Sequence, residues 1–66
     1  MTWTWRYEDG EGRPVDGPGE VFSSQADAES WVGQTWRDLA AGGIATVTLL
    51  EDDRSEYRMS LLAAGE

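Results

Sequence analysis

The sequence contains no cysteine, no histidine and no lysine. Without cysteine, the chain has no disulfide framework, no thiolate zinc site and no cysteine nucleophile. Without histidine, it also lacks the side chain that most often acts as a general base or a metal ligand. The composition therefore argues against an ordinary hydrolase and against a zinc module.

Long apolar stretches are also missing. No segment approaches the roughly 20 apolar residues that are needed to cross a bilayer. Residues 1–6 contain no basic segment followed by an apolar run, which is the pattern of a secretory signal. We therefore expect a cytoplasmic protein with no membrane partner.

Basic charge is scarce, because 5 arginines stand against 13 acidic residues and give a net charge of −8. Such a surface repels phosphate backbones, so direct binding of nucleic acid is disfavoured and a basic partner protein is favoured. The same charge also keeps a small protein in solution. Residues 1–66 are expected to form a single domain whose core is small, and a homodimer or a protein partner would supplement it.

Residues 24–41 have the periodicity of an amphipathic helix. Ser24 is a suitable N-cap, with a hydroxyl that accepts a hydrogen bond from the amide of Asp27. Gly42 and Gly43 are typical of a helix end. Gly33 costs the helix about 1 kcal/mol relative to alanine, and we interpret it as a close approach of a neighbouring element. The side chains that fall on one stripe are Ala28, Trp31, Val32, Thr35, Trp36, Leu39 and Ala40.

Residues 2–8 alternate like a strand with one buried face, on which Trp3, Trp5 and Tyr7 lie together. The stretch at residues 9–19 is rich in glycine and proline and predicts turns and loops.

Within the glycine-rich stretch, residues 13–15 are either a short edge strand or part of the loop, since Pro14 confines a strand to a sheet edge. Residues 44–50 are rich in β-branched side chains, and residues 56–61 alternate again, so we predict a hairpin from these two strands. Residues 63–66 are expected to be a frayed tail.

The predicted fold class is α+β, with one amphipathic helix on one face of a small, mainly antiparallel sheet of three to four strands, in the order β-(β)-α-β-β. The aromatic face of the first strand is expected to pack against the helix. The rule of right-handed crossovers predicts that the first strand and the strand at residues 44–50 run parallel. The last strand then lies between these two, which we prefer, or outside the strand at residues 44–50.

Acidic residues follow the two strands that are predicted to be parallel. Parallel strands would bring both groups to one end of the sheet, beside Asp27 and Glu29 of the helix. Their spacing matches no known calcium loop, and a sheet covered by one helix has little room for the apolar cleft that carboxyl catalysis needs. We interpret them as solvated turns or as an acidic docking surface formed by Glu8, Asp9, Glu11, Glu51, Asp52 and Asp53.

The face of the sheet that the helix does not cover is expected to be polar. Threonines and two arginines suit a solvated sheet face, and they also suit a protein interface, where arginine is favoured. Pairing of a sheet edge with another chain is a related alternative. The side chains expected on this face include Thr2, Leu50 and Leu62, and the candidate partner-binding residues are Thr4, Arg6, Thr46, Thr48, Arg58 and Ser60.

Five blocks of the sequence belong together: Thr2-Trp3-Thr4-Trp5-Arg6-Tyr7, Gln25-Ala26-Asp27-Ala28-Glu29-Ser30-Trp31, Trp36-Arg37, Val47-Thr48-Leu49-Leu50-Glu51-Asp52 and Met59-Ser60-Leu61. In length and block order the chain resembles a family of short uncharacterised proteins of actinobacteria. The resemblance is most specific around Trp31 and Leu49. It implies a cytoplasmic protein from a GC-rich genome, and it brings no activity, ligand or catalytic residue with it.

These observations favour a non-enzymatic, acidic, tryptophan-rich protein-protein interaction module without a cofactor. The partner would bind to the uncovered sheet face or to the acidic end. An alternative is that the carboxylates mimic nucleic acid and regulate a basic nucleic-acid-binding protein. A metal-assisted enzyme is a third hypothesis.

Overall fold

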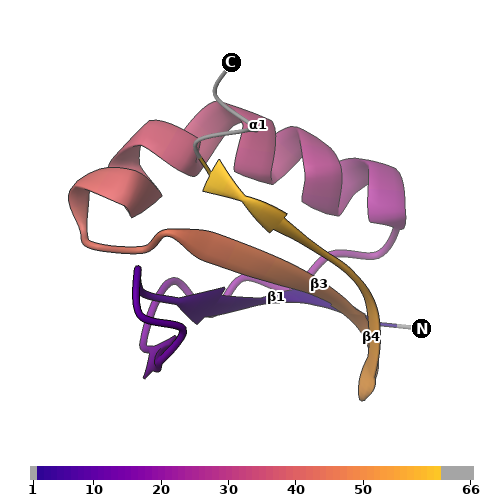
Figure 1. The fold of residues 1–66 in the computed structure, drawn as a ribbon. Coiled ribbons are helices and arrows are strands. Elements are labelled where there is room, and N and C mark those ends of the chain that lie inside the picture. The colour runs from indigo at the N-terminus through magenta and orange to yellow at the C-terminus, as the bar shows by residue number, and fades with distance from the viewer. Residues whose placement is uncertain (1, 62–66) are drawn as a thin grey trace.

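The computed structural model describes residues 2–61 (Figure 1). Over this range one helix packs on one face of an antiparallel sheet with the strand order β2-β1-β3-β4. The predicted α+β class is confirmed, whereas Leu62 and the tail at residues 63–66 lie outside the described residues. The elements are β1 (Trp3–Glu8), β2 (Pro14–Val15), α1 (Gln25–Ala41), β3 (Thr46–Glu51) and β4 (Arg54–Ser60).

Helix α1 begins and ends where the sequence predicts. The side chain of Ser24 accepts a hydrogen bond from the Asp27 amide at 3.2 Å, so the N-cap is confirmed. At the other end the Gly42 amide donates to the carbonyl of Leu39 at 3.1 Å, and Gly43 adopts a φ of +93°. That backbone conformation favours glycine, which explains why the helix ends there. No helix within residues 2–61 is long and apolar enough to cross a membrane.

The core lies between α1 and the sheet. Trp5 and Tyr7 of β1 are buried, as predicted, and the Trp5 indole Nε1 donates to the Ala28 carbonyl at 3.0 Å. A buried indole N–H needs such a partner, because leaving it unpaired would cost free energy. The remaining members of the core cluster are Ala28, Val32, Leu39, Ile44, Val47, Leu49 and Leu61.

The direction of β1 relative to β3 was predicted wrongly. These strands are direct neighbours and run antiparallel, with Trp5 opposite Leu49. Strand β4 lies outside β3 rather than between β1 and β3, so the arrangement that we preferred is also wrong. The edge strand at β2 is present, pairs with β1 alone and lies at the edge of the sheet.

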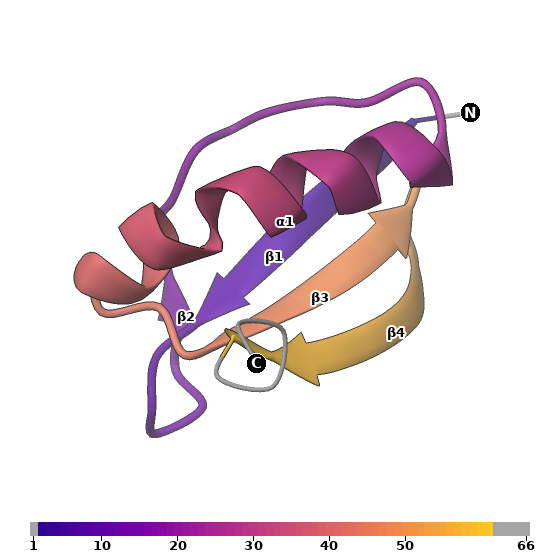
Figure 2. The same ribbon diagram turned by 90° about the horizontal axis from the view of Figure 1, so that it is seen from above.

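The cause is the segment at residues 16–22, which crosses the length of the sheet before α1 begins (Figure 2). It returns to the start of β1, where Trp3 and Phe22 exchange backbone hydrogen bonds of 3.0 and 2.8 Å. Helix α1 then runs in the same direction as β1 (Figure 2), and the Ala45 amide donates to the Glu8 carbonyl as β3 begins. Between β1 and β3 the chain runs the length of the sheet twice, back along residues 16–22 and forward along α1. The strands β1 and β3 are therefore antiparallel, and the crossover rule for parallel strands does not apply.

The interpretation of Gly33 was also wrong. A Cβ atom built at Gly33 has no heavy atom within 4 Å, so no neighbouring element approaches this turn of the helix. Gly33 lies on the exposed side of α1. The helix therefore carries the conformational cost of glycine without a packing reason for it.

We predict that Gly33→Ala raises the free energy of unfolding by about 1 kcal/mol, because alanine restricts the unfolded chain and favours the helix. Urea unfolding followed by circular dichroism measures the change. Gly43→Ala, just beyond the end of the same helix, is the contrasting control, and it should destabilise the protein because the φ of Gly43 is +93°. A Gly33→Ala variant that is less stable than wild type would contradict the open environment of this residue.

Candidate functional site

The sheet face opposite α1 is covered by no other element within residues 2–61 (Figure 1). We call the surface formed by the candidate partner-binding residues the open face. Its central row is set by the strand register, in which Arg6 of β1 lies opposite Thr48 of β3, and Thr48 lies opposite Arg58 of β4. The antiparallel pairing therefore places two guanidinium side chains on either side of one threonine.

A second row of the open face adjoins the arginine row. Here Glu8 lies opposite Thr46, and Thr46 lies opposite Ser60. Glu8 was assigned to the acidic docking group, but its side chain forms an ion pair with Arg58, with 3.2 Å between Oε1 and Nη2. The two residues come from strands that lie on either side of β3, so the ion pair spans the face.

The floor of the open face is less exposed than predicted. Thr48 keeps 7% of its surface exposed and Leu50 keeps 8%, although no element covers them. The reason is their place on β3, a central strand: Thr48 is flanked by Arg6 and Arg58, whose long side chains can lie along the sheet. Leu50 lies on the same central strand, between Thr4 of β1 and Ser55 of β4.

Arg6 differs from the other arginines of the chain. Arg13, Arg54 and Arg58 each form an ion pair with a carboxylate, and the guanidinium of Arg37 lies 5.3 Å from the centre of the Trp36 ring. Arg6 is exposed and forms no ion pair within the described part of the chain. Its charge is therefore available to a group from another molecule.

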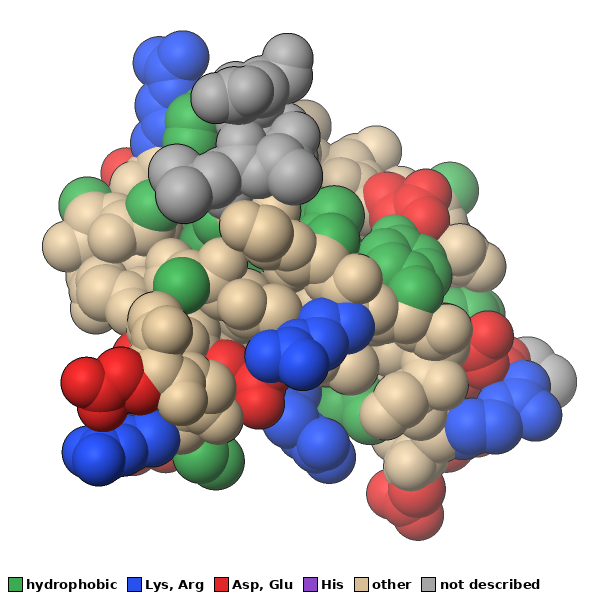
Figure 3. Space-filling view, viewed as in Figure 1, with side chains coloured by type: hydrophobic (Ala, Val, Ile, Leu, Met, Phe, Trp, Pro, Cys, Tyr) green, Lys and Arg blue, Asp and Glu red, His purple; other side chains and the backbone are tan. Residues whose placement is uncertain are grey.

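Charge is distributed unevenly over the surface. The open face carries two arginines and Glu8, so its formal charge is positive, whereas the whole chain has a net charge of −8. Figure 3 shows two basic side chains at the lower centre of the molecule with an acidic side chain beside them, and acidic and basic side chains together toward both lower sides. The open face is thus a cationic area on an anionic protein.

The acidic docking residues do not come together, which corrects the prediction. Because β1 and β3 are antiparallel, Glu8 lies at the end where β3 begins and Glu51 lies opposite Trp3 at the other end. Asp9 is engaged in its own turn, where its Oδ1 accepts from the amides of Glu11 and Arg13, both at 2.9 Å. Carboxylates from the two ends therefore cannot act on one ligand atom.

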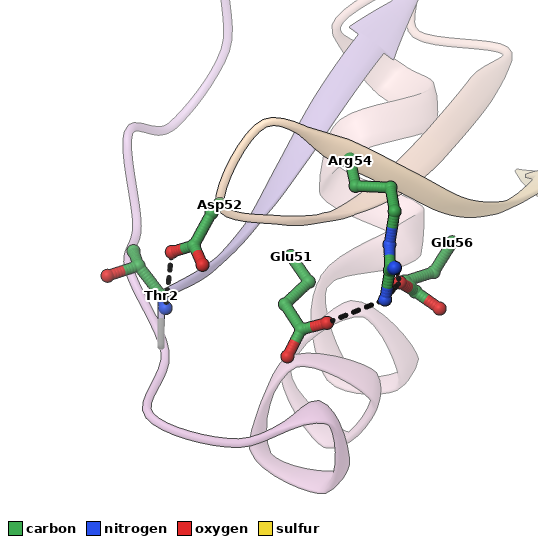
Figure 4. A network of polar contacts seen from close by, with 5 residues as sticks. All are labelled: Thr2, Glu51, Asp52, Arg54 and Glu56. Atoms are coloured by element: carbon green, nitrogen blue, oxygen red, sulfur yellow. Dashed lines mark hydrogen bonds and ion pairs between the residues drawn. The ribbon is translucent and has the colours of Figure 1, made fainter.

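The second acidic group surrounds the β3–β4 turn (Figure 4). The Asp52 carboxylate accepts from the Thr2 amide at 3.0 Å, and Glu51 forms an ion pair of 3.2 Å with Arg54. Asp53 is exposed. Glu51, Asp52, Asp53 and Arg54 line a hollow that is open to solvent, and within residues 2–61 no three acidic side chains form a group that could hold a metal ion.

Two tyrosines on the helix side of the sheet have raised pKa values. The Tyr7 hydroxyl donates to the Pro18 carbonyl at 2.8 Å, and burial, reinforced by the charge of Glu20, raises its pKa to about 12. The Tyr57 hydroxyl donates to Glu29 at 2.6 Å, and burial, followed by that hydrogen bond, raises its pKa as well. The same bond lowers the pKa of Glu29, with help from Gln25.

We predict that stability falls as the pH rises from about 10 toward about 12, because tyrosine ionises near pH 10 in the unfolded chain while folded Tyr7 keeps its proton up to about 12. The stabilisation from a raised pKa is complete below the unfolded value and is lost above it. Urea unfolding at a series of pH values tests this, and Tyr7→Phe should show a shallower decline than wild type. Equal declines in both proteins would contradict the role of Tyr7.

The comparisons with known proteins give no relative. No protein-family model, curated protein or solved structure shows a significant match to the chain. The resemblance to short actinobacterial proteins therefore stays a prediction. What the chain does has to be argued from its own residues.

Sequence reasoning placed Arg6, Thr48 and Arg58 on the correct face, because alternation along a strand fixes the side of each residue. It missed the role of Glu8 as the partner of Arg58. Alternation along β1 already placed Glu8, two residues after Arg6, on the same face as Arg6, so its presence on the open face could be predicted. The partner itself depends on the antiparallel register, which the sequence pattern did not reveal.

Proposed function

We propose that this protein is a cytoplasmic, non-enzymatic module that binds another protein through the open face. The observation that carries the proposal is the arginine row, in which Arg6, without an ion pair inside residues 2–61, lies one strand away from a buried threonine and two strands away from Arg58. Arginine is favoured at the centres of protein interfaces because it combines charge, apolar stem and several donors.

The shape of the open face supports binding of a macromolecule. A reaction centre needs a concave, water-excluding pocket that shifts the pKa of its acid or base. The hollow at Glu51–Arg54 is open to solvent and belongs to a turn outside the open face. A sheet face with a nearly buried floor suits contact with another surface better than enclosure of a substrate.

The two edges of the sheet are protected, which favours the face over the edges as the contact surface. Strand β2 is two residues long and contains Pro14, which cannot donate to a ladder. Strand β4 carries Arg54, Glu56 and Arg58, and its register shifts between Leu49 and Leu50 so that Glu56 bulges out of the pairing. Charges and bulges of this kind discourage edge-to-edge pairing.

Mimicry of nucleic acid has less support than binding through the open face. A mimic would present carboxylates in a continuous array, whereas here Glu8–Glu11 and Glu51–Asp53 lie at opposite ends of the sheet. Within these groups Glu8, Glu11 and Glu51 already form ion pairs with arginines of the same chain. The acidic charge nevertheless remains available for attraction of a basic partner.

Site-specific photo-crosslinking in a native lysate tests the proposal. A photoreactive amino acid at position 4 reports on the open face, and one at position 33 reports on the exposed side of α1 as a matched control. We expect a discrete protein adduct from position 4 that is absent from position 33 and is lost when Arg6 and Arg58 are both changed to alanine. Adducts from position 33 alone, or adducts that survive the arginine changes, would contradict the proposal.

A further inference from the structure

The charge on the open face identifies the chemistry of a partner that would fit it. Arg6 is exposed and has no carboxylate partner within residues 2–61, although the chain contains 13 acidic residues. We propose that the open face binds a carboxylate-rich segment of the partner protein, with Arg6 and Arg58 as the recognising groups and Glu8 as an internal competitor for Arg58. This inference rests on the proposed function and names the partner's chemistry.

The strand spacing sets the geometry of recognition. Arg6 and Arg58 lie on strands separated by β3, so their backbones are about 10 Å apart at the usual spacing of neighbouring strands. Each guanidinium can bind a carboxylate with two parallel hydrogen bonds. Two carboxylates of one segment that crosses the strands can therefore be held at the same time, above the buried Thr48.

Other anions fit this surface less well. A single small anion would need convergent donors in a concave site, whereas these two arginines stand apart on a sheet face. A nucleic-acid backbone presents many phosphates, but the open face offers two cations beside Glu8, and the rest of the chain is strongly acidic. A short acidic segment can contact the two arginines of the cationic row. At physiological salt, its repulsion by carboxylates of the chain that lie farther away than the Debye length of about 8 Å is largely screened.

Glu8 lowers the affinity of the open face for a carboxylate by competing for Arg58. Its carboxylate lies 3.2 Å from Arg58, and the side chain of Arg58 is 60% exposed, so an incoming carboxylate competes with Glu8 for the same guanidinium. The Glu8 side chain is 20% exposed, so the ion pair is open to solvent on its Arg58 side, where an incoming carboxylate can reach the guanidinium. Neutralising Glu8 should therefore strengthen binding, because it removes both a competitor for Arg58 and a negative charge beside the site.

The experiment is a titration of fluorescein-labelled hexaglutamate with the full chain, followed by fluorescence anisotropy at low and at physiological ionic strength. We expect saturable binding that Arg6→Gln weakens by about tenfold or more, as for loss of one charged hydrogen-bond donor. Arg58→Gln should act in the same direction, and Glu8→Gln should tighten binding several-fold. Arg54→Gln is the matched control, since Arg54 lies at the β3–β4 turn, and it should leave the affinity unchanged.

Several results would overturn the inference. They are absence of binding by the wild-type chain, equal affinity of wild type and Arg6→Gln, or unchanged affinity of Glu8→Gln. Tighter binding of labelled oligouridylate or of a phosphoserine peptide than of hexaglutamate would point to phosphate instead. Sedimentation showing self-association that Arg6→Gln abolishes would point to a second copy of the chain as the occupant.

The outcomes separate this inference from the proposed function. If hexaglutamate does not bind but the photo-adduct from position 4 persists and depends on the arginines, the open face is an interface for a partner of another chemistry. If the adduct is also absent, the proposed function fails as well. Urea unfolding of each variant checks that a loss of binding does not come from a loss of folding. Arg6 and Arg58 are exposed, so their substitution should change the free energy of unfolding by less than about 0.5 kcal/mol.

Discussion

Trp5→Ala should lower the free energy of unfolding by about 3–5 kcal/mol, the largest effect that we expect from a single substitution in this chain. The indole is 6% exposed, packs edge-on against Tyr57 and donates to the Ala28 carbonyl at 3.0 Å. Alanine leaves a cavity between β1 and α1 that the surrounding residues cannot fill completely. In a domain of this size such a loss is a large part of the total stability.

Urea unfolding followed by far-ultraviolet circular dichroism measures this change without relying on tryptophan emission. Trp5→Phe keeps an aromatic ring but loses the indole N–H, so its free energy of unfolding should lie between those of wild type and Trp5→Ala. Arg6→Ala is the control on the same strand. Arg6 is exposed on the opposite face, so this substitution should lower the free energy of unfolding only slightly. If Trp5→Ala and Arg6→Ala proved equally mild, the assignment of the two faces of β1 would be wrong.

Gly17→Ala should destabilise the protein by about 1–3 kcal/mol, because the new methyl group has no room. A Cβ atom at this position would lie 2.5 Å from Cδ2 and 2.7 Å from Cε2 of the Tyr7 ring. Tyr7 is 5% exposed, and its hydroxyl is held by the Pro18 carbonyl, so the ring cannot move aside easily. The substitution therefore tests whether the segment at residues 16–22 is packed on β1.

Gly19→Ala provides a control two residues along the same segment. A Cβ atom at Gly19 meets no heavy atom within 4 Å, so this variant should be neutral or more stable by up to about 1 kcal/mol. Thermal unfolding of both variants beside wild type gives the comparison. A Gly17→Ala variant as stable as Gly19→Ala would show that the chain does not pass over the Tyr7 ring.

The segment at residues 16–22 also explains which part of the fold could not be predicted. Its glycines and prolines have the composition of a loop, and no hydrophobic periodicity shows that it crosses the whole sheet. Seven extended residues reach about 23 Å, which is close to the length of the 17-residue helix at about 25 Å. The Trp3–Phe22 bridge and the Tyr7–Pro18 hydrogen bond show its path, and both are contacts between residues far apart in sequence.

The local features were predictable because local residues determine them. Ser24 and Gly42 mark the ends of α1 through capping, and the alternation in β1 assigns Trp5 to the core and Arg6 to the open face. Strand order and direction depend on long-range pairing instead. The grouping of acidic residues failed for this reason, since it was built on parallel strands.

The candidate site was predictable to the same extent. Alternation places Arg6, Thr48 and Arg58 on one face, but only the register shows that they form a single row. Thr48 is nearly completely buried, which its polarity does not predict, and the register places it between two long arginine side chains. The Arg58–Glu8 ion pair joins strands that are not adjacent and has no counterpart in the linear sequence.

The antiparallel register of β1 and β3 sets the arginine row and separates the acidic groups. Trp3 directs its backbone hydrogen bonds to Phe22, away from β3, so Trp5 and Leu49 form a pair without mutual hydrogen bonds, in which the Cα atoms approach closely. A nuclear Overhauser spectrum should therefore show a strong contact between the Hα protons of Trp5 and Leu49. Absence of that contact, with cross-strand contacts in a parallel pattern, would show that β1 and β3 run parallel and that the arginine row does not exist.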